Sequence, residues 1–177
     1  MPFWRRNKLP ADRTPALEAD ERVLAWSPAG PDGTATVVAT HRGLWLPGAQ
    51  QRWGWHEIHK ASWSGTELTI IGAQVVTVGD DFTVVTDAAP QTFTLTEPGE
   101  VPHQIRARVT GAVAFTQHFA GPTGGAGVRV VAHRLVGADG LSWTVRYDQG
   151  IDPADPAVRA ATAALVAEAK AATAPAP

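Results

Sequence analysis

Apolar and polar residues alternate in short runs over most of the first hundred residues, a pattern typical of β-strands. The runs are rich in Val, Ile, Thr, Trp and Phe, and Gly, Pro or Asp residues separate them. We expect seven strands, at residues 22–28, 34–41, 43–46, 57–64, 67–72, 82–86 and 92–96. Residues 1–14 lack this period and are expected to form a flexible tail.

The period then changes to that of a helix, with apolar residues four positions apart. The residues on this expected face are Val101, Ile105, Val109 and Val113. Pro98 and Pro102 mark its first turn, because a first turn tolerates residues without an N–H, and we expect the helix to end near Phe119. It should close one core with strand residues Ile58, Trp63, Ile70, Val84 and Phe93.

The last third of the chain predicts a flexible connection, a hairpin and a second helix. The connection is "AGPTGGAG", and Asp139 and Gly140 form the expected turn of a hairpin over residues 128–147. Either Asp152 with Pro153 or Asp155 with Pro156 can begin the closing helix. Its expected core-facing residues are Val158, Ala161, Leu165 and Ala169. We therefore expect a domain over residues 15–119 and an extension over 120–177 that packs on it.

Composition narrows the class of protein. Apolar residues make up 44% of the chain and charged residues 18%, as in soluble globular proteins. The formal net charge of −2 gives no drive toward nucleic acid, so no nucleic-acid partner is expected. Cysteine is absent, and neither a signal peptide nor a membrane-spanning run is evident, so we expect a cytoplasmic protein. Abundant Arg, Ala, Val and Gly are typical of a GC-rich bacterial genome.

Seven strands followed by a helix, with "VVATHRGLWLP" leading into "RWGWHEIHKASW", resemble the bacterial PH-like and GRAM-like domains of the pleckstrin-homology superfold. The resemblance covers about residues 20–117. It implies an α+β fold in which a bent antiparallel sheet, or partly open barrel, of seven strands is capped by a helix. The C-terminal hairpin and helix lie outside the resemblance and are expected as an addition.

Four tryptophans lie between Leu44 and Trp63. Trp45 and Trp63 are expected in the core, whereas Trp53 and Trp55, with His56, are candidate contacts for a protein partner. A regular strand would place Trp53, Trp55 and Trp63 on one face. The turn or bulge usual near "WHEI" in the PH-like family would instead turn Ile58, Ala61 and Trp63 inward, and the sequence leaves both arrangements open.

No motif indicates catalysis or a cofactor. His56 and His59 are three residues apart, whereas a zinc-binding pair on a helix needs four, so no metal is expected. The serines lie in no G-x-S-x-G pattern, and Asp80 with Asp81 is best explained as a solvated turn.

The loop "SPAGPDGT" bears on lipid binding. By the resemblance, it corresponds to the basic first hairpin loop of the phosphoinositide-binding members of the pleckstrin-homology superfold. It holds an aspartate and no cation, so headgroup recognition there is not expected. A membrane surface could instead meet the basic aromatic N-terminus. The candidate membrane contacts are Phe3, Trp4, Arg5, Arg6 and Lys8.

The sequence therefore favours a non-enzymatic binding or scaffolding module that contacts a protein partner or its own copy through a sheet edge or an aromatic rim. The first alternative is a peripheral membrane protein that uses the N-terminus. The second is an enzyme with a small-molecule pocket between the barrel and the extension.

Overall fold

The computed structural model describes residues 8–121 and 125–174, and it has the mixed α+β architecture expected from the sequence. The first strands are β1 (Val23–Ala29), β2 (Ala35–Thr40), β3 (Gly43–Trp45), β4 (Trp53–Gly54), β5 (Ile58–Trp63) and β6 (Glu67–Val78). They are followed by β7 (Thr83–Asp87), β8 (Gln91–Thr94), β9 (Val113–Phe119), β10 (Val128–Arg134) and β11 (Leu141–Tyr147). The helices are α1 (Val101–Ala112) and α2 (Pro156–Thr173), with short 3-10 turns η1 (Ala11–Arg13) and η2 (Trp55–Glu57).

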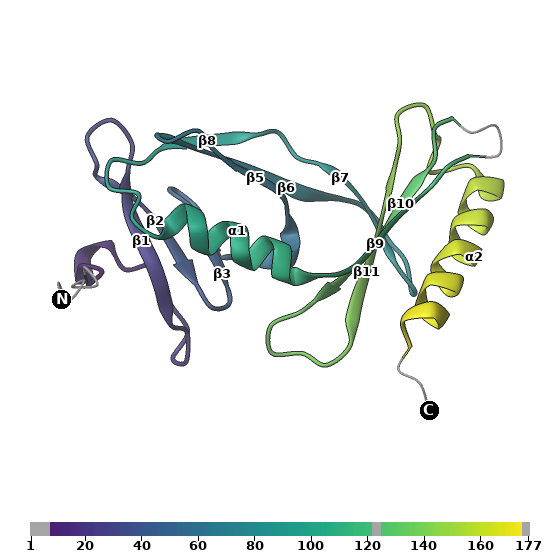
Figure 1. Ribbon diagram of the computed structural model, residues 1–177, viewed down its shortest axis with the longest axis horizontal. Helices are drawn as coiled ribbons and strands as arrows, with labels where there is room; N and C mark the ends of the chain where they lie inside the picture. The colour runs from purple at the N-terminus through teal and green to yellow at the C-terminus, as the bar shows by residue number, and fades with distance from the viewer. Residues whose placement is uncertain (1–7, 122–124, 175–177) are drawn as a thin grey trace.

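One hydrophobic core lies between α1 and the first eight strands. Strands β1 to β4 form an antiparallel sheet, and β5, β6 and β8 form the opposing layer. Figure 1 shows α1 running lengthwise between these two layers. Leu44 and Ile70 of the sheets and Ile105 of the helix are fully buried in this core.

A second core lies under α2 at the C-terminal end of the molecule. Strands β6, β7, β11, β10 and β9 follow one another across a sheet, with β7 and β11 paired in parallel. Figure 1 shows α2 beside this sheet. Val166 and Ala169 of α2 are buried against one face of it. The strand residues buried with them are Val128, Val130, Ala132, Trp143 and Val145.

Strand β6 belongs both to the layer that it forms with β5 and β8 and to the sheet under α2, because it is 12 residues long. Its first half, up to Gly72, pairs with β5 and β8, and its second half pairs with β7 alone. The strand expected at residues 67–72 is therefore half of the observed one.

The expected extension of α1 to Phe119 is wrong, because the helix ends at Ala112 and the next seven residues form β9. The side chains of Val113 and Phe115 are β-branched or aromatic, and β9 pairs with β10 along its length. The spacing of four residues between Val109 and Val113 is typical of a helix face. Here, however, Val109 lies in the last turn of the helix and Val113 is the first residue of the strand.

The expected core is confirmed for most of its residues. Ile58, Ile70 and Ile105 are buried together, and Trp63, Phe93 and Val109 pack against them. A bulge after Ile58 sets the inward positions of β5, so Ile58, Ala61 and Trp63 share the core. Val84 is buried outside this cluster, and Val113 lines a cavity described below.

The closing helix differs in its buried face. Asp155 caps it, because its carboxylate accepts a hydrogen bond from the Ala157 amide at 2.8 Å. Thr162 and Val166 are buried beside Ala169, whereas Ala161 is exposed. Leu165 and Ala169 of the expected face pack in the second core and Val158 is half-buried, whereas the prediction for Ala161 is wrong because Thr162 is buried in its place.

A buried carboxylate fixes the segment before β1. Glu21 accepts hydrogen bonds from Thr40 Oγ1 at 2.6 Å and Trp45 Nε1 at 3.1 Å. Arg52 Nη1 lies 2.7 Å from its other oxygen, and Arg42 pairs with Glu18 and Asp20 beside it. This network holds the segment against β2 to β4. Among the described residues, no helix is long and apolar enough to cross a membrane.

Candidate functional sites

The tryptophan cluster forms no exposed aromatic patch. Trp55 is 3% exposed and donates a hydrogen bond to the Thr40 carbonyl at 3.2 Å, so its expected role as a surface contact is wrong. The η2 turn is the cause, since it breaks the strand and directs Trp55 into the core. Trp53 is half-buried, with its ring lying over Gly72, and His56 is half-buried near Gly54.

The candidate membrane contacts lie almost wholly outside the described part of the chain. Phe3, Trp4, Arg5 and Arg6 precede residue 8, where the description begins. Lys8 is exposed. Membrane contact through this segment stays a prediction.

The second half of β6 has one edge without a partner strand among the described residues. From Gln74 onward β6 pairs with β7 on one side, while β5 ends its pairing at Gly72 on the other. Exposed large apolar side chains gather here: Val75 at 57%, Val76 at 50% and Val78 at 75%. The edge is thus accessible, and its exposed side chains are three valines with the uncharged polar Gln74 and Thr77.

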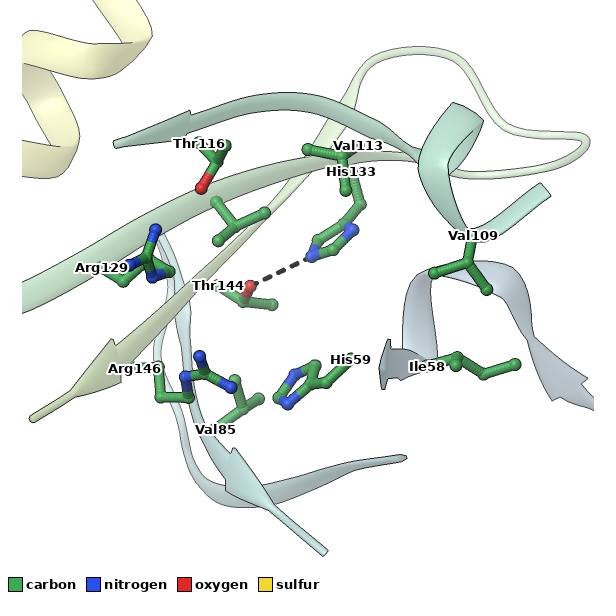
Figure 2. Close-up of a pocket in the computed structure, with 11 residues that line it drawn as sticks. Ile58, His59, Val85, Val109, Val113, Thr116, Arg129, His133, Thr144 and Arg146 are labelled. Atoms are coloured by element: carbon green, nitrogen blue, oxygen red, sulfur yellow. Dashed lines mark hydrogen bonds between the residues drawn. The ribbon is translucent and has the colours of Figure 1, made fainter. Parts of the chain in front are cut away.

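A cavity of about 170 Å³ lies between the first core and the sheet that carries α2. Its walls come from β5, β7, α1, β9, β10 and β11 (Figure 2). The aliphatic lining residues are Ile58, Val85, Val109, Val113 and Val131. The polar lining residues are His59, Thr116, Arg129, His133, Thr144 and Arg146. None of these described lining residues is acidic.

Strand alternation places the polar side chains in the cavity. On β10, Val128, Val130 and Ala132 face α2, so the alternate residues Arg129, Val131 and His133 face the opposite side. On β11, Thr144 and Arg146 face the cavity for the same reason. One sheet therefore has an apolar face toward α2 and a mixed, cationic face toward the cavity.

His133 is the most enclosed polar side chain of this cavity, with 6% of its surface exposed. Its Nε2 lies 3.3 Å from Thr144 Oγ1, and its buried Nδ1 has no hydrogen-bond partner among the described residues (Figure 2). Burial, together with the nearby His56 and His59, lowers the pKa of His133 to about 4. The ring is therefore neutral near pH 7.

Two guanidinium groups share the same wall. Arg129 and Arg146 are opposite each other in the pairing of β10 and β11. Arg146 Nη1 lies 2.6 Å from Asp87 Oδ1, and His59 Nδ1 lies 2.7 Å from the same oxygen. Burial raises the pKa of Asp87, but the hydrogen bond from His59 and the charge of Arg146 more than offset it, so this pKa is lowered.

The backbone of Arg129 belongs to the β9–β10–β11 ladder, but its guanidinium group forms no hydrogen bond or ion pair with any residue in the ranges 8–121 and 125–174. Asp148 is near enough for its pKa to be lowered slightly by Arg129, but its carboxylate binds His118 Nε2 at 2.7 Å and the Gly127 amide at 2.8 Å. The Arg129 guanidinium therefore lies near one carboxylate but has no directly paired counter-ion in the described part of the chain.

Three histidines come together here, which the sequence did not indicate, since His56, His59 and His133 lie on different segments. Within the described ranges, however, no group of three or more His, Asp or Glu side chains is arranged to hold a metal ion. The expectation that the protein binds no metal stays a prediction.

The sequence left open a pocket between the barrel and the extension, but it did not identify the residues that line this cavity. The signal was present in "VRVVAHR" and "SWTVRY", where polar residues alternate with apolar ones that α2 covers. Two polar positions at matched places in a hairpin predict one shared polar face.

Comparisons with protein-family models, with curated proteins and with solved structures found no match. The fold and the two sites therefore carry the functional interpretation, and a fold alone does not determine function.

Proposed function

We propose that this protein is a non-enzymatic scaffolding module that associates with a second copy of itself through the free edge of β6. The observation that carries the proposal is the exposure of Val75, Val76 and Val78 on an edge without a partner strand in the described chain. Exposed apolar edge strands are ready templates for pairing with another strand.

The composition of the edge favours a second copy as the partner. Residues 73–78 contain no charged side chain and no proline, the devices by which monomeric proteins usually protect an edge. Two such edges in antiparallel pairing bring uncharged residues opposite uncharged residues, with no repulsion between the copies. The resulting interface has the twofold symmetry that is commonest among homo-oligomers.

The bulge between Val75 and Thr77 limits the length of the pairing. Bulges twist an edge and interrupt its ladder of hydrogen bonds. We therefore propose a short shared ladder in which valine side chains supply most of the buried surface.

The test is the molar mass of the protein in solution, measured by sedimentation equilibrium over a range of concentrations. We expect the wild-type chain to dimerise and the Val78→Lys variant to remain monomeric, because an edge lysine must lose its hydration to pair. Val136→Lys is the matched control, since Val136 is also exposed, at 49%, but lies in the β10–β11 connection. It should dimerise like the wild type.

A wild-type monomer at the highest concentration, or a Val78→Lys dimer, contradicts self-association through this edge. Far-UV circular dichroism of each variant shows whether its fold is retained.

The membership of residues 20–117 in the PH-like and GRAM-like group is also a proposal. It is supported by a curled sheet of short strands with a single helix packed against it. The β9 to β11 sheet and α2 lie outside that resemblance.

A further inference from the structure

We infer that the cavity between α1 and the β9–β11 sheet binds a small organic monocarboxylate with an apolar group, held by Arg129. This site is separate from the β6 edge, and its test does not depend on self-association.

The charge of the cavity points to an anion. Arg129 and Arg146 project from opposed positions on neighbouring strands, and only Arg146 has an acidic partner, Asp87. Asp87 is paired with Arg146, and Asp148, which is near enough to interact with the charge of Arg129, is hydrogen-bonded to His118 and Gly127, so the Arg129 guanidinium has no directly paired carboxylate among the described residues. A guanidinium group binds a carboxylate through two parallel hydrogen bonds, which supplies the missing partner of Arg129.

The aliphatic wall points to an apolar group attached to that anion. Val109, Val113 and Val131 lie on the side of the cavity formed by α1, β9 and β10. An inorganic anion would leave these side chains against water, whereas a hydrocarbon group removes them from it. The ligand class is therefore amphipathic.

The size of the cavity sets an upper limit to the ligand. Its volume is about 170 Å³, and an apolar cavity of about 150 Å³ accommodates benzene. A single ring or a short branched chain with one carboxylate fits this space, and a nucleotide or a long acyl chain does not.

His133 provides independent evidence for a polar contact inside the cavity. Its Nδ1 is buried and lacks a partner in the described chain, which is uncommon for a polar atom in a folded protein. The other ring nitrogen faces Thr144, so the ring is oriented and Nδ1 can exchange a hydrogen bond with a bound molecule.

Three probes test the inference: benzoate, benzamide, which has the size of benzoate without its charge, and inorganic phosphate, which is an anion without an apolar group. Titration calorimetry of the full chain should give saturable binding of benzoate in the sub-millimolar to millimolar range. Benzamide has the same shape without the charge and should bind at least tenfold more weakly. Phosphate should not compete with benzoate.

Arg129→Gln should weaken benzoate binding at least tenfold, whereas Arg106→Gln, a change of an exposed arginine on α1, should leave it unchanged. If Arg129→Gln alters the fold, two other measurements locate the ligand: benzoate titration of the His133→Gln variant, and amide chemical-shift mapping of benzoate on the wild type. Absence of saturable benzoate binding, equal affinity for benzamide, or shifts confined to residues outside β10 and β11 would overturn the inference.

Discussion

Glu21 and Arg52 form an ion pair, 2.7 Å between Oε2 and Nη1, in which the glutamate side chain has no exposed surface. Such a pair is costly to form, because both charges leave water, and its remaining oxygen must find donors of its own. Thr40 and Trp45 are those donors, so the pair is satisfied on both oxygens.

Glu21→Gln should lower the free energy of unfolding by about 3 kcal/mol, because it leaves Arg52 without its buried partner. Urea denaturation at pH 7 measures the change. The matched control is Glu18→Gln, since Glu18 pairs with the same arginine but its side chain is 51% exposed. That change should cost less than about 1 kcal/mol. Equal losses for the two variants would contradict a special role of the buried carboxylate.

The Glu21 site also predicts a loss of stability in acid. Burial raises the pKa of Glu21, but hydrogen bonds from Thr40 and Trp45, with Arg52, more than offset this, so the pKa lies below its ordinary value of 4.5. A group with a lowered pKa in the folded state stabilises the protein above its unfolded pKa. The difference in stability between wild type and Glu21→Gln should therefore shrink as the pH falls below 4.5.

His133 predicts a pH dependence in a different window. Its pKa is about 4 in the folded protein against an ordinary 6.5, so between these values only the unfolded chain binds the proton. The free energy of unfolding should therefore fall by about 3 kcal/mol in total as the pH drops through this window. Denaturation at several pH values from 7.5 to 5 avoids most of the carboxylate titrations.

His133→Gln should flatten that slope, and His103→Gln, at an exposed position on α1, should not. Part of the slope will remain in the His133 variant, because burial also lowers the pKa of His56. An unchanged slope in the His133 variant would show that another group is responsible.

Two glycines predict opposite effects of the same substitution. Gly72→Ala places a Cβ within the volume of the Trp53 ring and should destabilise the protein by about 1–3 kcal/mol. Gly111→Ala adds a Cβ that meets no neighbouring atom within 4 Å in the last turn of α1. It should stabilise the protein by about 0.5–1 kcal/mol, because alanine loses less backbone entropy in a helix. Thermal unfolding of both variants decides whether the signs differ.

Truncation after Phe119 should give an insoluble or strongly destabilised protein. It removes β10, which pairs with β9, and β11, which pairs in parallel with β7. The valines of the first core would remain, but two strands would lose their partners. Truncation after Ala174, which keeps α2 intact, is the control. A soluble truncated monomer with an unchanged melting temperature would contradict the expected dependence of the domain on its extension.

Alternation of apolar and polar residues in the sequence predicts those strands that have one solvent-exposed face and one buried face. It located β1, β2 and β5 within one or two residues, and the bulge after Ile58 was one of the two arrangements that the sequence left open. β4 was missed because two residues carry no period. β9 was missed because Val113 continues the spacing of the α1 face, and only pairing with β10 distinguishes the two structures.

The candidate contacts were less predictable than the fold. Trp55 is adjacent to a polar loop in the sequence, and the single η2 turn that buries it depends on tertiary packing. The cavity required knowledge of which face of the hairpin α2 covers, since the same alternation is compatible with either face inward. Arg129 and His133 become informative only after that choice is made.

The length of β6 has a consequence for motion. One strand, with a bulge between Val75 and Thr77, continues from the first core into the sheet of the second, and α1 passes into β9 without an intervening loop. Hinges form at segments whose backbone dihedrals change at little cost, and neither crossing is such a segment. Two continuous backbone connections between the halves oppose a change in the width of the cavity, so the ligand proposed above would meet a preorganised site.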